Sequence, residues 1–174
     1  MTTLLEGKQD GRGLRIGIAV ARFNQDITGA LLEGCLHVLR EAGVAEDDLT
    51  VAWVPGAFEL PLACDRLAAS GRHDAVIALG CVIRGGTPHF EYVSAAACDG
   101  VMEVNLKHEL PVVLGVLTCD DLAQARHRAD REVLLGAGAQ VPAEREAKET
   151  PASNKGAEAA ETALEMVHLL RGMA

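Results

Sequence analysis

Short apolar segments alternate with helical patterns along this chain of 174 residues, and this alternation limits the possible folds more than any other feature. Each apolar segment is nearly continuous, which is typical of a strand buried on both faces. Strands joined through helices pair in parallel by right-handed crossovers. The sequence therefore predicts an α/β fold, a three-layer α/β/α sandwich around a four-stranded parallel sheet with flavodoxin-like architecture. The predicted strands span 14–21, 49–54, 75–83 and 111–117.

Helical patterns occupy the remaining segments, and capping residues mark where they begin. Asp26 or Thr28 is the predicted cap of the first helix, and Asp120 or Asp121 that of the fourth. Residues 1–13 are predicted to form a polar arm, and residues 1–174 a single domain. The predicted helices span about 26–43, 58–69, 89–108, 120–135 and 157–170.

The composition narrows the possible ligands. A formal charge of −9 argues against nucleic acid and against an anionic membrane surface as partners. An anionic ligand would therefore need a locally basic pocket. Nearly half of the residues are apolar, but only three Phe, one Trp and one Tyr are aromatic. We therefore expect an aliphatic core, in which the positions of the few aromatic residues carry information.

The cysteines and histidines show no pattern of a disulfide or metal protein. Five cysteines form no Cys-x-x-Cys pair, and their number is odd. The chain shows neither a signal-peptide pattern nor an apolar run near ~18 residues. We therefore expect a cytoplasmic protein with reduced thiols, in which Cys81 and Cys119 are small core residues. The histidines other than His89 have no metal-ligand spacing, so no metal is expected.

Residues 80–92, Gly-Cys-Val-Ile-Arg-Gly-Gly-Thr-Pro-His-Phe-Glu-Tyr, carry the densest chemistry of the chain. A buried strand ends there, and two glycines, a threonine, a proline and a histidine precede a helix. Glycine amides at a helix N-terminus can bind an anion, and a histidine beside them can transfer protons. The alternative interpretation is a helix-capping loop with a surface histidine.

Polar or aromatic clusters follow the ends of all four predicted strands. Because the carboxyl ends of parallel strands share one edge, where α/β proteins bind ligands, we expect these clusters to form one site. They lie at Phe23, 56–59, 84–89 and Thr118. Phe23 is placed to stack on a heterocycle and Glu59 to bind a polyol. Each also has a structural interpretation, since a Phe after a strand is commonly core and Glu59 complements a helix dipole.

Two further segments carry positive charge against the acidic background. Arg126 and Arg128 follow the fourth strand, and Ser-Asn-Lys-Gly at 153–156 opens the last helix. Both segments are candidates for bringing cations to the glycine loop, with a surface role as the alternative.

Taken together, these segments resemble the lumazine synthase family of riboflavin biosynthesis. The segments occur in family order over 14–129 and 153–170, and their combination is far more specific than any single motif. They are Ala-Arg-Phe-Asn (21–24), Val-Pro-Gly-Ala-Phe-Glu-Leu-Pro (54–61), Ala-Leu-Gly-Cys-Val-Ile-Arg-Gly-Gly-Thr-Pro-His-Phe-Glu-Tyr (78–92), Gly-Val-Leu-Thr (115–118) and Asn-Lys-Gly (154–156).

The resemblance implies an enzyme that condenses 5-amino-6-ribitylamino-uracil with 3,4-dihydroxy-2-butanone 4-phosphate to 6,7-dimethyl-8-ribityllumazine. Phosphate and water are released, and no metal or organic cofactor takes part. By the same resemblance Phe23 stacks on the pyrimidine, and His89 moves protons. The pyrimidine edge meets the backbone of Val82 and Ile83. The resemblance also implies that the ribityl chain contacts Ala57, Phe58 and Glu59. The phosphate is implied to contact Gly86, Thr87 and Arg128, and Lys155 is implied to lie near it.

Three departures from the family pattern stand out. Leu114 occupies a position that is usually aromatic, on one wall of the ring pocket, and Gly86 replaces a common Ala or Glu. Residues 130–152 are an insertion where the family has a short connection. Within it, 142–151 is predicted to form a short solvated helix with a Glu144–Lys148 pair.

The resemblance also implies an assembly. Family members are pentamers, some of which form hollow icosahedral shells, and neighbouring chains share each site. We therefore expect a homo-oligomer, a pentamer at least, with riboflavin synthase as a possible partner. The insertion is expected to disfavour or alter the standard shell.

Two other interpretations stay open at this point. A non-catalytic relative that binds flavin or lumazine, or only forms a shell, would keep the pocket without turnover. The presence of both His89 and Arg128 favours the enzyme. A flavodoxin-like redox module would use the same sheet edge for a nucleotide phosphate, but this sequence lacks a Ser/Thr-rich loop after the first strand.

Overall fold

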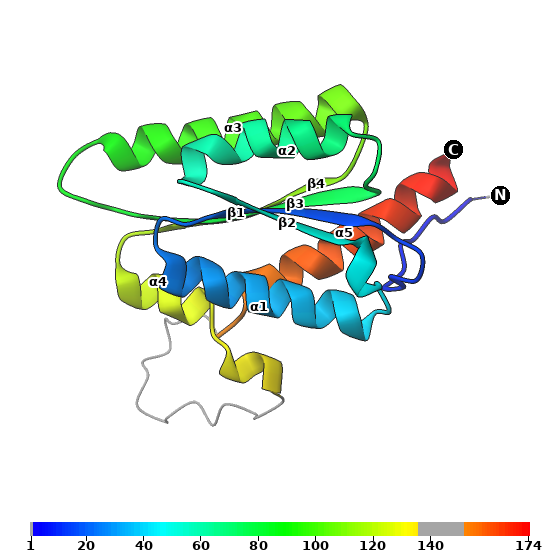
Figure 1. Ribbon diagram of the computed structural model, residues 1–174, viewed down its shortest axis with the longest axis horizontal. Coiled ribbons are helices and arrows are strands. Elements are labelled where there is room, and N and C mark those ends of the chain that lie inside the picture. The colour runs from blue at the N-terminus through cyan, green and yellow to red at the C-terminus, as the bar shows by residue number, and fades with distance from the viewer. Residues whose placement is uncertain (1, 136–151) are drawn as a thin grey trace.

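A parallel sheet between two layers of helices forms the body of the molecule (Figure 1). The structure is a computed structural model that describes residues 2–135 and 152–174. The strands are β1 (Ile16–Ala21), β2 (Leu49–Val54), β3 (Ala75–Ile83) and β4 (Val112–Cys119), in the order β2-β1-β3-β4. Helices α2 (Leu60–Ala69) and α3 (His89–His108) cover one face, and α1 (Gln25–Glu41), α4 (Leu122–Arg128) and α5 (Lys155–Met173) cover the other. The predicted α/β fold with a four-stranded parallel sheet is confirmed.

The core lies on both faces of the sheet, which explains why the strands read as continuous apolar segments. Every residue of β1 is buried. Ile16, Ile18 and Val20 pack in a cluster with α1 and α5, whereas Ala19 and Ala21 belong to the cluster with α2 and α3. The buried apolar residues of the described chain are aliphatic or cysteine, as the shortage of aromatic residues predicted.

The cap of helix α1 (Gln25–Glu41) lies two residues before Asp26 and four before Thr28, the two predicted caps. Its N-cap is Asn24, whose backbone is in the left-handed conformation, so the predictions of Asp26 and Thr28 as caps are wrong. The Asn24 carbonyl accepts hydrogen bonds from Ile27 N (2.9 Å) and Thr28 N (3.0 Å). The chain therefore turns into the helix directly after the strand. Asp26 complements the dipole of the first turn, and Thr28 is buried within the helix.

Two other element boundaries differ from the prediction. A separate 3₁₀ turn, η2 (Ala57–Glu59), precedes α2, so Phe58 lies in a turn and not in the helix. Strand β4 extends to Cys119 because β3 is long enough to pair with it, with Val82 opposite Thr118 and Ile83 opposite Cys119. Thr118 therefore lies inside a strand rather than after one.

Helix α4 ends at Arg128, well short of the predicted end near residue 135. Asp121 is its cap, and the Asp121 carboxylate accepts a hydrogen bond from Gln124 N at 2.8 Å. Beyond Arg128 the chain pairs with the segment that returns from the insertion. Ala129 and Asn154 form an antiparallel bridge, and Ser153 N donates to the carbonyl of His127 at 3.1 Å. These long-range bonds end the helix.

The two ends of the insertion therefore lie side by side at the start of α5. A 3₁₀ turn, η3 (Glu132–Leu135), follows the bridge. The predicted helix at 142–151 and its Glu144–Lys148 pair lie outside the described residues. Because the chain leaves and returns at one point, the insertion does not carry Lys155 away from Arg128.

Helix α5 begins on a buried cap that holds it against α1. The Asn154 side-chain oxygen accepts hydrogen bonds from Gly156 N (3.0 Å) and Ala157 N (3.1 Å), and its amide donates to Ala30 O (3.0 Å). A Cβ at Gly156 would lie 1.9 Å from Leu31 O, so the close approach of the two helices requires glycine there. Residues 153–156 open the last helix, as predicted.

The N-terminal arm lies along α5. Gln9 Nε2 donates to Glu161 O at 3.2 Å, and His168 Nε2 donates to Asp10 O at 2.7 Å. A third short 3₁₀ turn, η1 (Glu46–Asp48), leads into β2. No helix of the described residues is long and apolar enough to cross a bilayer.

Candidate functional site

A cavity of about 580 Å³ opens at the carboxyl ends of β1, β2 and β3, and we call it the rim cavity. Its volume lies within the range of small-molecule sites. Four predicted segments contribute to it: the turns after β1 and β2, the last residues of β3, and the loop that leads into α3. Its lining residues are Phe23, Gly56, Ala57, Phe58, Glu59, Cys81, Val82, Ile83, Gly85, Thr87, His89, Phe90, Tyr92 and Val93.

Aromatic rings concentrate at the rim cavity. Four of the five aromatic residues of the chain line it: Phe23, Phe58, Phe90 and Tyr92. The Phe23 side chain is 71% exposed, that of Phe58 62% and that of Tyr92 74%. Exposed rings of this size in a protein whose core is aliphatic mark a surface that a ligand or a partner covers. Flat rings also offer faces on which a heterocycle can stack.

Backbone hydrogen bonds between neighbouring strand ends fix Phe23. The β1–β2 pairing continues past the strands, since Arg22 N donates to Val54 O (2.8 Å) and Phe23 N donates to Pro55 O (3.1 Å). On the other side, the amide of Asn24 donates to Cys81 O of β3 at 2.9 Å. The ring of Phe23 therefore extends from a turn that is tied to both neighbouring strands.

The turn before α2 positions Ala57, Phe58 and Glu59. Gly56 is fully extended, and the 3₁₀ turn that follows leaves Ala57 buried, Phe58 exposed and Glu59 half-buried at the N-cap of α2. The Glu59 carboxylate lies back over Gly56, where a Cβ would come within 3.2 Å of Glu59 Oε2. A hydrogen-bond acceptor therefore lies at the cavity wall.

The loop from β3 to α3 is anchored at its base and open at its tip. The backbone amide of Arg84 donates to Cys119 O (2.9 Å). The Arg84 guanidinium donates to Asp120 Oδ1 (2.8 Å) and forms an ion pair with Glu91. The guanidinium carbon also lies 4.2 Å from the centre of the Phe90 ring. Hydrogen bonding to Arg84 lowers the pKa of Glu91. Two carboxylates therefore hold the charge of Arg84, which braces the loop.

The tip of this loop presents backbone amides without hindrance. Apart from the glycine itself and its two chain neighbours, no heavy atom of the described chain lies within 4 Å of the position where a Cβ would lie at Gly85 or at Gly86. Residues 84–89 are exposed, and Thr87 and His89 line the cavity. Gly86 lies between two lining residues but is not itself a lining residue of either cavity. An anion that approached this tip would meet the amides, the Thr87 hydroxyl and the start of α3.

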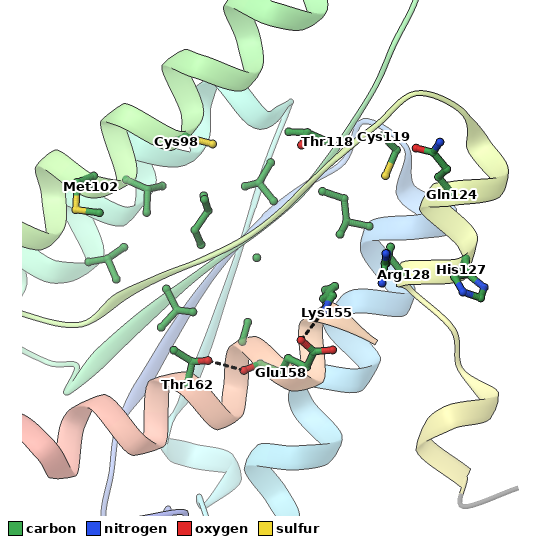
Figure 2. Close-up of a pocket in the computed structure, with 18 of the residues that line it drawn as sticks. Cys98, Met102, Thr118, Cys119, Gln124, His127, Arg128, Lys155, Glu158 and Thr162 are labelled. Carbon is green, nitrogen blue, oxygen red and sulfur yellow. Dashed lines mark hydrogen bonds and ion pairs between the residues drawn. The ribbon is translucent and has the colours of Figure 1, made fainter. Parts of the chain in front are cut away.

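A second and larger cavity, of about 1370 Å³, runs along the open edge of β4, and we call it the β4 cavity. Figure 2 shows side chains of α3, β4, α4 and α5 around it. Leu114, Arg128 and Lys155 line it, together with Thr118. The rim cavity and the β4 cavity share no lining residue.

The cations of the β4 cavity lie beside acidic and thiol groups. Lys155 Nζ is 2.6 Å from Glu158 Oε2, one turn further along α5. Burial raises the pKa of the Cys119 thiol, and the charge of Arg128, which lines the same cavity, opposes this effect. Arg126 and His127 also line this cavity. The cations Arg126, Arg128 and Lys155 therefore line the β4 cavity together with three carboxylates, those of Asp121, Asp130 and Glu158.

The structure thus divides the predicted site. It brings together at the rim cavity Phe23, Ala57, Phe58, Glu59, Val82, Ile83, Thr87 and His89. It places Leu114, Arg128, Lys155 and Thr118 at the β4 cavity, so within this chain these four residues do not line the rim cavity. Strand β4 lies at the edge of the sheet beside β3, so β3 separates it from β1 and β2.

Sequence reasoning missed Phe90 and Tyr92 as lining residues. The spacing contained the signal, because Tyr92 and Val93 follow His89 by three and four residues and therefore lie on the same helix face. In the described ranges 2–135 and 152–174, no three His, Cys, Asp or Glu side chains group as metal ligands.

A comparison with protein families places these features in context. The model of the family described as 6,7-dimethyl-8-ribityllumazine synthase matches residues 13–171, a span that holds the whole sheet and both cavities. The chain belongs to this family. Membership supports a transferase of riboflavin biosynthesis that acts on small molecules, and it implies oligomeric assembly in general.

Proposed function

Because the chain belongs to this family, we propose that the protein condenses 5-amino-6-ribitylamino-uracil with 3,4-dihydroxy-2-butanone 4-phosphate to 6,7-dimethyl-8-ribityllumazine. One observation carries the proposal: four of the five aromatic side chains surround a cavity that also holds a histidine and an open glycine loop. A heterocycle, a proton transfer and a leaving phosphate each find a matching group there. The reaction needs no metal or organic cofactor.

The pyrimidine binds against Phe23 and the end of β3. The β1–β3 pairing ends at Val20 and Leu79, whereas β3 continues to Ile83. Backbone polar groups alternate between the two edges of a strand, and Cys81 O faces Asn24 on the β1 side. Ile83, two residues on, therefore presents its amide and carbonyl on the same side. These groups can pair with the edge of a ring that stacks on Phe23.

The ribityl chain extends toward the start of α2. Ala57 and Phe58 offer a wall, and the half-buried carboxylate of Glu59 accepts hydrogen bonds from hydroxyl groups. This arrangement holds the pyrimidine by both ends, so that its 5-amino group points toward the loop that carries Thr87 and His89.

The phosphate of the ketone needs more than the glycine loop. Gly86 and Thr87 supply an amide and a hydroxyl, but the cations Arg128 and Lys155 line the β4 cavity. We propose that the rim cavity of one chain meets the β4 cavity of a neighbour in a pentamer, which completes the site. Leu114 then closes the ring pocket from the neighbour's side. Riboflavin synthase, which consumes the lumazine, is the proposed partner protein.

The chemistry depends on orientation and proton transfer. The 5-amino group attacks the ketone carbonyl, and loss of water leaves an imine. Elimination of phosphate follows, and the ribitylamino nitrogen closes the second ring with loss of water. His89 moves protons at each stage, while the cations stabilise the departing phosphate. Holding both reactants in register supplies most of the rate.

Two further features complete the proposal. All five cysteines are free thiols, which fits a reaction in the reducing cytoplasm. The insertion leaves the chain beside the β4 cavity, at the bridge of Ala129 with Asn154. We therefore propose that it disfavours or alters the standard icosahedral shell. Mass measurement in solution that shows the ordinary shell would contradict this.

One assay tests the function. Purified protein given both substrates develops lumazine absorbance, and His89→Ala slows the reaction by about a hundredfold while pyrimidine affinity stays within about twofold of wild type. His37→Ala is the matched control, because His37 is exposed on α1 and lines neither cavity. Flavin or lumazine binding by wild type without turnover would instead establish a binding protein.

A further inference from the structure

Asn24 combines a rare backbone conformation with a long-range hydrogen bond. Among the described residues only Asn24 (φ 59°) and Glu109 (φ 49°) have positive φ without being glycine. The left-handed region is costly for most side chains, and asparagine tolerates it better than most. At Asn24 the backbone reverses direction between the end of β1 and the start of α1. The position therefore demands a specific conformation.

The side chain of Asn24 does not cap α1, although it occupies the N-cap. Its amide instead crosses to β3 and donates to Cys81 O at 2.9 Å, a contact between residues 57 positions apart. The β1–β3 pairing has already ended at Val20 and Leu79. The amide therefore adds one further bond between the two strands, beyond the last backbone rung. Cys81 is 2% exposed, so loss of this donor would leave a largely buried carbonyl without it.

This bond lies between two parts of the rim cavity. Phe23 precedes Asn24, and Val82 follows Cys81, and both line the cavity, whereas Asn24 is not a lining residue. The backbone amide of Phe23 also donates a hydrogen bond to Pro55 O, but this bond is directed toward β2. It therefore does not fix the distance between Phe23 and β3. The Asn24 amide spans that side.

We infer that Asn24 is a positioning residue that sets the gap between the Phe23 ring and the backbone of Val82 and Ile83. It does so through the left-handed turn together with the amide bond to Cys81. The consequence for the reaction rests on the proposed function, because that gap is where the flat ring of the pyrimidine and of the lumazine product is held.

Substitutions at Asn24 separate the contribution of the left-handed turn from that of the amide bond to Cys81. Asn24→Gly keeps the turn and removes the amide. Asn24→Asp keeps the size of the side chain but places a carboxylate oxygen against Cys81 O. Glu109→Gly is the matched control, since it relaxes the other positive-φ residue at the far end of α3. Circular dichroism and thermal unfolding verify that each variant is folded.

The experiment has a structural and a binding measurement. We expect crystal structures of Asn24→Gly and Asn24→Asp without ligand to show Phe23 displaced from Ile83, and fluorescence titration to show lumazine dissociation constants about tenfold above wild type. The KM for the pyrimidine rises with it, while the shape of the kcat pH profile stays unchanged. Glu109→Gly matches wild type in all of these.

Wild-type positions of Phe23 in both variants, or unchanged lumazine affinity, would overturn the inference. A wild-type protein that fails to turn over both substrates overturns the proposed function instead, and the displacement of Phe23 between ligand-free structures still decides the role of Asn24.

Discussion

The rim cavity lies at the ends of three strands, whereas the β4 cavity runs along the whole of β4, and the two hold different chemistry. The rim cavity gathers aromatic rings, a histidine and open backbone amides. The β4 cavity brings the cations Arg126, Arg128 and Lys155 to the outermost strand, beside three carboxylates. A heterocycle fits the first and an anion the second. Because neither cavity alone holds all the groups that the proposed reaction needs, we propose a site made by two chains.

Arg128→Ala is expected to give the largest difference between the two cavities, because it alters only the β4 cavity. Loss of a charged hydrogen-bond donor should lower kcat/KM for the phosphorylated ketone about a hundredfold and leave lumazine affinity within about twofold of wild type. Steady-state kinetics and fluorescence titration measure the two quantities. Arg40→Ala is the control, since Arg40 pairs with Glu46 and lines neither cavity. Equal losses in kcat/KM and in lumazine affinity would contradict the proposal that Arg128 acts on the ketone phosphate and not on the heterocycle.

Substitutions of the aromatic residues in the rim cavity are expected to weaken lumazine binding, by a smaller factor than Arg128→Ala lowers kcat/KM. Phe23→Ala should weaken lumazine binding about tenfold because a stacking face is lost. Its free energy of unfolding should stay within about 0.5 kcal/mol of wild type, since the ring is exposed. Tyr92→Ala removes an equally exposed ring from α3 and should weaken binding less. If Tyr92→Ala has the larger effect, the stacking platform lies on α3 and not after β1.

The smallest effect concerns the contact between α2 and the C-terminal end of α3, far from His89 at the other end of that helix. Hydrogen bonds from Lys107 and then His108 lower the pKa of Asp65 on α2 from 3.8 to about 2. A carboxyl with a lowered pKa stabilises the fold above its unfolded pKa, and the contribution is lost as the pH falls from about 4 to about 2. Asp65→Asn should therefore reduce stability at pH 7 by at most about 1 kcal/mol, and by less at pH 3.

Chemical denaturation at both pH values measures this difference. Asp99→Asn, an exposed position on α3, is the control. Because Asp65 lines neither cavity, ligand affinities should not change. A loss at pH 3 as large as that at pH 7 would show that the ion pairs of Asp65 do not stabilise the helix pair.

The sequence predicted correctly those elements whose position depends on nearby residues. The apolar segments located all four strands, and the helix at His89–His108 was placed correctly because its start and end signals lie within it. The clusters after β1, β2 and β3 do converge, since they follow adjacent strands of the sheet. Most of the rim cavity could thus be assembled from the sequence, but Cys81, Phe90, Tyr92 and Val93 were not predicted to line it.

The failures arose where distant segments decide the outcome. Helix α4 stops at Arg128 because residues 129 and 154 pair, and nothing near Arg128 in the sequence announces that bridge. Thr118 lies inside β4 because β3 is long. The separation of Arg128 from His89 follows from the position of β4 at the edge of the sheet, which depends on strand order and not on any motif.

The most direct test of the two-chain site is complementation between inactive variants. His89→Ala damages the rim cavity and Arg128→Ala the β4 cavity, so oligomers of either variant alone should be nearly inactive. In oligomers that contain both chains at random, about one boundary in four joins an intact rim cavity to an intact β4 cavity. We therefore expect about a quarter of wild-type activity. Activity that stays at the level of the single variants, while native mass spectrometry shows mixed oligomers, would contradict the account.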